Sequence, residues 1–152
     1  MTDVRRLCVD SNVLLFAAND SSPWHEAACR ALHDAYHGKV EVCISPQITR
    51  EYLASATRIE RATCGTPAFA RIMENIETFK AAFEMLNETS ATVDALLDIV
   101  EQVPTGGKQI HDANIVAVMR VYGIHHLLTH NERDFVRFSR WITVVPLESW
   151  KE

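Results

Sequence analysis

Four acidic residues of this sequence occupy positions from which their carboxylates can meet. Asp10 directly follows the first predicted strand, and Asp134 lies just beyond the fourth. Asp112 stands where a long helical pattern begins, and Glu51 lies one to two turns into the helix that follows the second strand. Because open parallel sheets bind ligands at the carboxyl ends of their strands, we expect the four carboxylates at that rim.

A cluster of four carboxylates indicates a site for a divalent cation. Like charges held together repel, so the four acids would not all ionise without a counter-charge. Mg²⁺ and Mn²⁺ prefer oxygen ligands and resolve that conflict. A metal ion so held lowers the pKa of a bound water and polarises a phosphoryl oxygen, which is the chemistry of phosphodiester hydrolysis. Each acid taken singly is more simply explained as a helix-start or surface group, and only the set of four favours the metal site.

The elements that must position these acids alternate between strands and helices. Short apolar runs predict strands at residues 7–9, 40–44, 83–86, 124–129 and 141–145. Helical spacing of apolar residues predicts helices at 13–18, 23–36, 46–58, 69–79, 90–103 and 112–122. Residues 130–134 are expected to form a polar loop. This alternation, without an internal repeat, predicts one α/β domain over residues 1–152 with a parallel sheet and right-handed crossovers.

The charge pattern excludes one class of function and leaves a local question open. A net charge of −5 argues against a protein that coats nucleic acid by bulk electrostatics. Arg133, Arg137 and Arg140 would share a face if their segment is helical, either as solvated surface or as a phosphate contact beside the acids. No apolar run is long enough to span a membrane, and no signal-type segment opens the chain, so we expect a cytoplasmic protein.

Three stretches carry a resemblance to a known family. They are CVDSNVLL at 8–15, ISPQITREYL at 44–53 and HDANIVAVMRVYGIHHLLTHNERDF at 111–135. In these stretches the chain resembles the PIN-domain ribonucleases, specifically the VapC-type toxins of prokaryotic toxin–antitoxin modules. The motifs are short, but their order and spacing extend the resemblance over nearly the whole chain.

The resemblance implies a set of site residues. The catalytic, metal-binding acids of the family fall on Asp10, Glu51, Asp112 and Asp134. Many relatives carry an acid at the position of Asn131, whereas others use the acid of the Asp-Phe pair at 134–135, so the fourth acid is assigned to Asp134. Small polar residues that position the acids and the metal waters fall on Ser11, Asn12 and Thr129, with Asn131 as a further polar helper.

The resemblance also implies a fold, an activity and partners. It implies a three-layer α/β/α sandwich with a five-stranded parallel sheet, and Mg²⁺- or Mn²⁺-dependent cleavage of single-stranded RNA. It further implies a homodimer and inhibition by a small antitoxin protein that docks near the active site. The apolar stripe of the helix at 69–79 independently indicates a homodimer, because it is stronger than a lone edge helix needs.

The same residues allow three other interpretations. A haloacid-dehalogenase-like phosphatase also starts with an aspartate after its first strand, but it needs a second aspartate two residues on, where this chain has Asn12. A PIN nuclease of RNA processing outside a toxin module remains an alternative. A catalytically silent PIN-like binding module is a third, and the presence of all four carboxylates argues against it.

The histidines stay outside the predicted catalytic set. His33 and His37 are four residues apart on a helix, but nothing is placed to complete a zinc site, so a solvated helix face is expected. His111 and His130 flank assigned acids and are positioned to contact RNA. A mechanism that uses a metal-bound water requires neither of them.

Overall fold

The computed structural model describes residues 5–38 and 40–150 and contains a five-stranded parallel sheet. The strands are β1 (Arg6–Val9), β2 (Glu41–Ile44), β3 (Glu84–Met85), β4 (His126–Thr129) and β5 (Thr143–Pro146). Their order is β3-β2-β1-β4-β5, and each neighbouring pair is parallel. The chain therefore winds outward from β1 in both directions, and the strand order reverses between β1 and β4. Open α/β sheets bind ligands at such a point.

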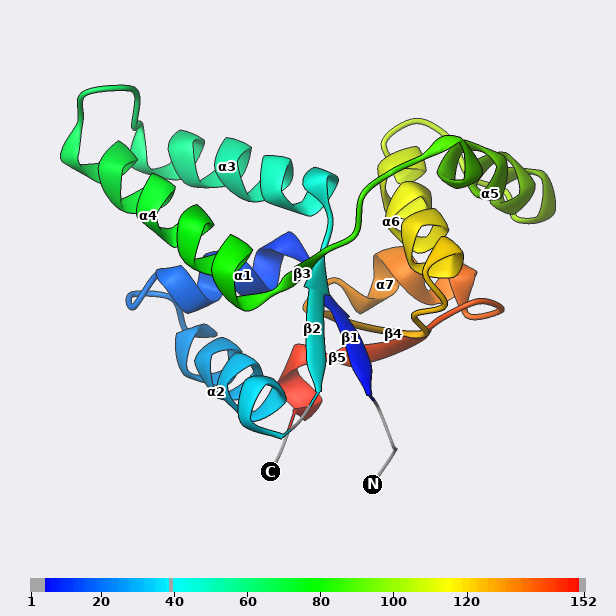
Figure 1. Ribbon diagram of the computed structural model, residues 1–152, viewed down its shortest axis with the longest axis horizontal. Helices are drawn as coiled ribbons and strands as arrows, with labels where there is room; N and C mark the ends of the chain where they lie inside the picture. Colours follow the sequence, from blue (N-terminus) through cyan, green and yellow to red (C-terminus); the bar gives the residue numbers. More distant parts are fainter. Residues whose placement is uncertain (1–4, 39, 151–152) are drawn as a thin grey trace.

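Helices cover both faces of this sheet. They are α1 (Ser11–Ala18), α2 (His25–His37), α3 (Pro46–Glu60), α4 (Pro67–Ala82), α5 (Ser90–Gln102), α6 (Gln109–Val121) and α7 (Glu132–Phe135). Two short 3₁₀ helices, η1 (Val136–Phe138) and η2 (Leu147–Ser149), complete the described chain. Figure 1 shows α1 to α4 on one side of the sheet and α5 and α6 on the other. The predicted three-layer α/β/α sandwich is confirmed.

Local signals set the ends of the helices that lead to the site. Ser45 accepts a hydrogen bond from the Ile48 N–H (3.2 Å), and Pro46 takes the first helical position, so α3 begins where the Ser-Pro pair predicts. Gly123, with φ of +68°, follows the last turn of α6 in the left-handed conformation that glycine favours. Helix α1 starts at Ser11, two residues earlier than predicted, because Asp10 caps it.

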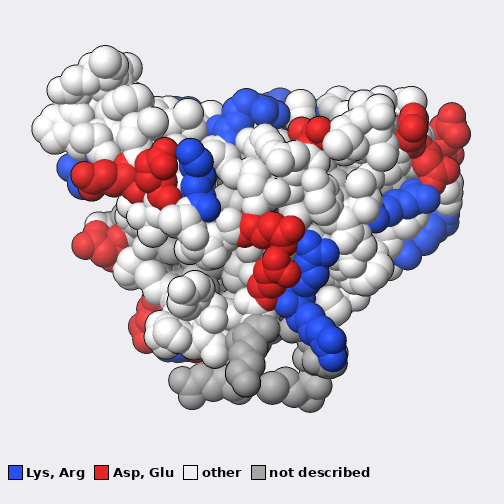
Figure 2. Space-filling model, viewed as in Figure 1, with Lys and Arg blue, Asp and Glu red and all other residues white. Residues whose placement is uncertain are grey.

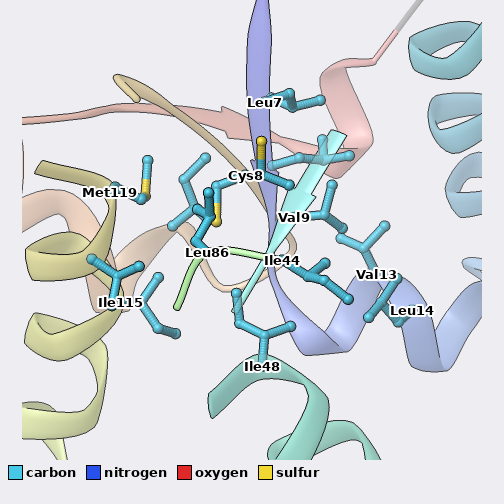
Figure 3. Close-up of a cluster of buried hydrophobic side chains, with 14 of the residues drawn as sticks. Leu7, Cys8, Val9, Val13, Leu14, Ile44, Ile48, Leu86, Ile115 and Met119 are labelled. Carbon is cyan, nitrogen blue, oxygen red and sulfur yellow. The ribbon is translucent and has the colours of Figure 1, made fainter. Parts of the chain in front are cut away.

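The core anchors the helices on both sides of β1. Figure 3 shows Val13 and Leu14 of α1 on one side of the strand and Ile115 and Met119 of α6 on the other, with Ile48 of α3 below. All five side chains are buried, and burying one such side chain stabilises a fold by roughly 1.5–3 kcal/mol. The helices that reach the site are thus held mainly by apolar packing, to which the caps at their ends add.

The segment after β4 differs from its prediction. Residues 130–134 were expected to form a loop, but Glu132–Phe135 is a one-turn helix that continues into η1. Phe135 and Phe138 are buried and anchor this turn in the core. Arg137 donates to Pro104 O (3.3 Å) and Gln109 Oε1 (2.6 Å), so it packs against the connection between α5 and α6.

Helix α5 exposes two of its large apolar side chains. Val93 and Leu97 are 55% and 54% exposed. Thr92 occupies the buried side instead, and its hydroxyl is satisfied because it accepts from the Thr89 N–H (3.0 Å).

The apolar stripe predicted at 69–79, on α4, packs within the chain, for example through the edge contact of Phe79 with Tyr52 on α3, whose ring centroids lie 5.2 Å apart. The homodimer stays a prediction.

The charged surface matches the low net charge of the chain. On the face shown in Figure 2, acidic and basic side chains lie beside one another, without a broad area of one sign among the residues described there. Within the described ranges, no helix has both the length and the apolar character needed to cross a membrane.

Candidate active site

Asp10 lies at the end of β1, at the point where the strand order reverses, and both of its carboxylate oxygens accept hydrogen bonds. Its N–H donates to Leu128 O (3.0 Å), so the pairing of β1 with β4 continues up to the site. One carboxylate oxygen accepts from the Ser11 N–H (2.8 Å). The other accepts from the Thr129 hydroxyl (2.8 Å) and the Asn12 amide (3.2 Å). Asp10 is 5% exposed, so its orientation is fixed before any ligand binds.

The residues that hold Asp10 also join the two loops that leave β1 and β4. The Asn12 amide donates to Thr129 Oγ1 (3.2 Å), and Asn12 Oδ1 accepts from the His130 N–H (3.1 Å). Thr129 Oγ1 in turn accepts from the Asn131 N–H (3.0 Å). The structure thereby brings Asn12 and Thr129, two of the predicted supporting residues, directly against Asp10.

Its enclosure changes the acidity of Asp10. Burial raises the pKa of this carboxyl from 3.8 to about 6. Hydrogen bonds from Thr129 and Ser11 lower the pKa in part, and the charges of Glu51 and Asp134 raise it further. A buried carboxylate that lacks a cation favours its protonated form.

Asp112 reaches the same edge from the first turn of α6 and is half-buried. Burial raises its pKa to about 7, and the next contributions come from the charges of Asp134, Asp10 and Glu51. Arg137 opposes them and lowers the pKa. The four predicted acids therefore lie close enough to repel one another across this edge of the sheet.

Glu51 extends to this edge from α3. Its Oε2 accepts from the Ser11 hydroxyl (3.4 Å), and its Oε1 accepts from Gln47 Nε2 (2.8 Å). Gln47 also donates to the carbonyl of His111 (2.7 Å), the residue before Asp112. Our reading of the sequence missed Gln47. The available signal was its position four residues before Glu51, which places both side chains on one helix face.

Asp134 and Asn131 form the exposed margin of the site. Both side chains are exposed, in contrast to Asp10, which is buried, and to Glu51 and Asp112, which are half-buried. A hollow of about 410 Å³ opens here, and its lining residues are His130, Asn131, Glu132, Arg133, Asp134 and Glu148. An extended ligand that reaches the buried acids can therefore pass over this margin.

The donor set fits a hydrated Mg²⁺ or Mn²⁺ ion. Among the residues that the structure describes, no three Asp, Glu, His or Cys side chains already form a group that could hold a metal ion. Mg²⁺ keeps several waters and binds through one or two carboxylates plus substrate phosphates, so it needs no closed protein cage. Burial and the charges of neighbouring acids raise the pKa values of Asp10 and Asp112, and carboxyl groups in that situation along an open edge suit such an ion.

The histidines take the places expected for accessory groups. His130 packs against the Trp24 ring, with ring centroids 4.4 Å apart, and faces the carboxylate of Glu148. His33 and His37 are exposed and lie side by side on α2, with ring centroids 4.3 Å apart. Because both side chains are exposed, the predicted solvated helix face is confirmed.

A groove of mixed character lies beside the site, between the α1–α2 connection and the helices α3 and α4. Its volume is about 370 Å³, and its lining combines apolar side chains such as Leu15, Phe16 and Ile59 with the charged Glu60 and Arg71. Ile59 is 59% exposed, although it is a large apolar side chain. Phe16 also contacts the His130 ring (5.3 Å between centroids), so the groove adjoins the segment that follows β4.

Comparison with known sequences places the chain in one family. A family model described as the PIN domain matches residues 7–140 of the chain. Ribonuclease VapC37 of Mycobacterium tuberculosis is 28% identical over 138 residues, which cover 88% of this chain and 93% of the relative.

Solved structures share the fold. A structure of VapBC2 from Rickettsia felis, bound to a DNA fragment from its promoter, superposes with a TM-score of 0.68 at 14% identity and covers 93% of this chain and 98% of that chain. VapC20 of Mycobacterium tuberculosis, described as a sarcin–ricin loop cleaving toxin, superposes with a TM-score of 0.59 at 19% identity and covers 80% and 86%. At these identities the likeness establishes the architecture.

Proposed function

This chain belongs to the PIN-domain family, and from that premise we propose that it is a divalent-metal-dependent endoribonuclease that cleaves single-stranded RNA. The observation that carries this proposal is the set of four carboxylates at the β1–β4 edge, two of them with pKa values raised to about 6 and about 7. The names of its relatives, Ribonuclease VapC37 and the loop-cleaving toxin VapC20, support the same activity.

In this proposal the residues of the site have distinct tasks. Asp10 and Asp112 would hold the metal ion, and Glu51 and Asp134 would complete the site. Bound Mg²⁺ or Mn²⁺ supplies polarisation of a phosphoryl oxygen and acidification of a water molecule. Ser11, Asn12 and Thr129 hold Asp10 in one orientation through their hydrogen bonds. Asn131 stands at the exposed margin, where RNA would enter.

A phosphatase is a weaker alternative on the same evidence. The dehalogenase-like mechanism needs an acid two residues after the first aspartate. The structure has there an amide, Asn12, which donates to Asp10 and Thr129 and cannot act as a general acid or base. A silent binding module gives no reason to keep four mutually repelling acids together.

Nuclease activity is tested with the purified chain on single-stranded RNA, tRNA and a ribosomal RNA loop. We expect cleavage with Mn²⁺ or Mg²⁺ and none in EDTA, because the acids alone have no nucleophile to offer. Cleavage that continues in EDTA would exclude the metal mechanism. If all three RNAs remain uncleaved at millimolar Mn²⁺, the result would favour a catalytically silent binding module.

We also propose that the protein is the cytoplasmic toxin of a toxin–antitoxin pair and forms a homodimer. The relatives of known structure include toxin–antitoxin complexes, and the groove beside the site, where the apolar side chain of Ile59 is exposed, suits a segment of a small antitoxin. Light scattering is expected to give a dimer mass for the chain alone and a larger complex after coexpression with a small antitoxin encoded next to its gene.

The variant Ile59→Glu tests whether the antitoxin binds in the groove. It places a charge in the groove, so we expect it to keep the dimer mass and lose the antitoxin. The matched control is Tyr36→Glu, at a side chain that is 62% exposed on α2 and does not line the groove. A monomer mass at micromolar concentration would refute the homodimer, and an intact Ile59→Glu complex would refute the groove.

A further inference from the structure

Gln47 is a buried amide whose hydrogen bonds all lead to the helices that carry the acids. It is 2% exposed. Its Nε2 donates to Glu51 Oε1 (2.8 Å) and to His111 O (2.7 Å), and its Oε1 accepts from Asn114 Nδ2 (2.7 Å). Both N–H groups of the amide are therefore used, one on α3 and the other on α6.

The orientation of this amide is determined by its neighbours. A flipped amide would place Oε1 of Gln47 against two acceptors, the Glu51 carboxylate and the His111 carbonyl. Asn114 is oriented in the same way, because its Nδ2 also donates to Glu88 Oε1 (2.7 Å) at the surface. A continuous chain of hydrogen bonds thus runs from the exposed Glu88 through two amides to Glu51.

We propose that Gln47 is a positioning residue that fixes Glu51 relative to Asp112, and that Asn114 acts through it. The proposal rests on the metal site of the proposed function. Gln47 ties the carboxylate of Glu51 to the backbone immediately before Asp112. It therefore sets the distance between two acids that are carried by different helices.

The expected effect lies in metal affinity. Residues that orient metal ligands through hydrogen bonds typically change metal affinity or activity by about 10- to 100-fold when they are replaced. Gln47→Met keeps the length of the side chain and removes the amide, which leaves Glu51 with only its longer hydrogen bond from the Ser11 hydroxyl (3.4 Å). We expect the dissociation constant for Mn²⁺ to rise by about 10- to 100-fold.

A matched control separates positioning from loss of stability. Ser45→Ala removes the cap of the same helix end, where Ser45 Oγ accepts from the Ile48 N–H (3.2 Å). Ser45 makes no hydrogen bond to Glu51, so this variant is expected to melt at a lower temperature and to bind Mn²⁺ as the wild type does. The measurement is calorimetric titration of the full-length protein with Mn²⁺ alone, without RNA.

The action of Asn114 through Gln47 gives a second test. Asn114→Leu is expected to weaken Mn²⁺ binding less than Gln47→Met, because Gln47 keeps its bonds to Glu51 and His111. The double variant is expected to match Gln47→Met, since two residues in one network are not additive. In cleavage assays, the Mn²⁺ concentration for half-maximal rate should rise by the same factor while the KM for RNA stays unchanged.

Each result decides the proposal. Weakened Mn²⁺ binding in Gln47→Met together with normal binding in Ser45→Ala supports it. Wild-type affinity in Gln47→Met, or equal weakening in Ser45→Ala, overturns the positioning role and leaves the proposed function standing. A wild-type protein that binds no Mn²⁺ at millimolar concentration overturns both.

Discussion

Replacing Asp10 with asparagine is expected to lower the rate of metal-dependent RNA cleavage by about 10²-fold or more, a loss of several kcal/mol of transition-state stabilisation. Asparagine keeps the shape of the side chain and removes the charge that a metal ion needs. The fold should persist, because the helices around the site are held by buried apolar side chains. The measurement is the cleavage rate with Mn²⁺ or Mg²⁺ for both proteins.

The same variant should change how stability depends on pH. In the folded wild type the pKa of Asp10 is about 6, while an aspartate in an unfolded chain titrates near 3.9. Between these values the folded state binds more protons than the unfolded state, so the free energy of unfolding falls as the pH rises through this window. The full effect of this shift is about 3 kcal/mol, at 1.36 kcal/mol per pKa unit. Because asparagine does not titrate, Asp10→Asn does not lose this stability as the pH rises.

The sign of the stability difference should therefore reverse with pH. Asparagine presents one amide group where Asp10 has an acceptor, which removes a hydrogen bond and costs about 1 kcal/mol. In EDTA at about pH 4, where the wild-type carboxyl is protonated, the variant should be slightly less stable. At about pH 8 it should be more stable than the wild type by about 1–2 kcal/mol. Thermal unfolding at both pH values gives the comparison.

Two results would count against this role of Asp10. A variant that unfolds much more easily than the wild type in EDTA at high pH would make Asp10 a structural residue. A variant that cleaves RNA at the wild-type rate would place the metal ion elsewhere.

Replacing Asp112 with asparagine is expected to have an effect of similar size, about 10²-fold or more in rate. Asp112 is half-buried, and three neighbouring carboxylates raise its pKa, so its charge lies inside the cluster. Asp134→Asn should cost less, about 10-fold or about 1.4 kcal/mol, because Asp134 is exposed at the margin. The rates are measured at saturating Mn²⁺ and again at limiting Mn²⁺.

Asp94→Asn is the control for loss of a negative charge, since Asp94 is exposed on α5, away from the site. It should cleave at the wild-type rate. If Asp134→Asn loses more activity than Asp112→Asn, the order of importance proposed for the acids is wrong. If both behave like Asp94→Asn, neither residue binds the metal ion.

Much of the architecture was predictable because it is encoded locally. The Ser-Pro pair at 45–46 marks the start of α3, and Gly123 marks the end of α6. The aspartates at 10 and 112 lie at element ends that apolar periodicity reveals, and parallel strands bring such ends to one edge. These features depend on residues within a few positions of one another.

What the sequence did not reveal depends on contacts between distant segments. Gln47 and Asn114 are 67 residues apart, and nothing local to either predicts their hydrogen bond. The turn at 132–135 is helical because Phe135 and Phe138 are drawn into the core, although its polar letters favour a loop. Val93 and Leu97 are exposed because the side of α5 that faces the core carries the polar Thr92.

The central claim, that these carboxylates bind a catalytic divalent cation, is tested most directly by X-ray diffraction. Crystals of the wild-type protein soaked in Mn²⁺ and measured near the manganese absorption edge locate the ion without knowledge of the RNA substrate. The account predicts an anomalous peak at the β1–β4 edge, within coordination distance of Asp10 and Asp112. A well-occupied manganese peak elsewhere, with none at this edge, would contradict it.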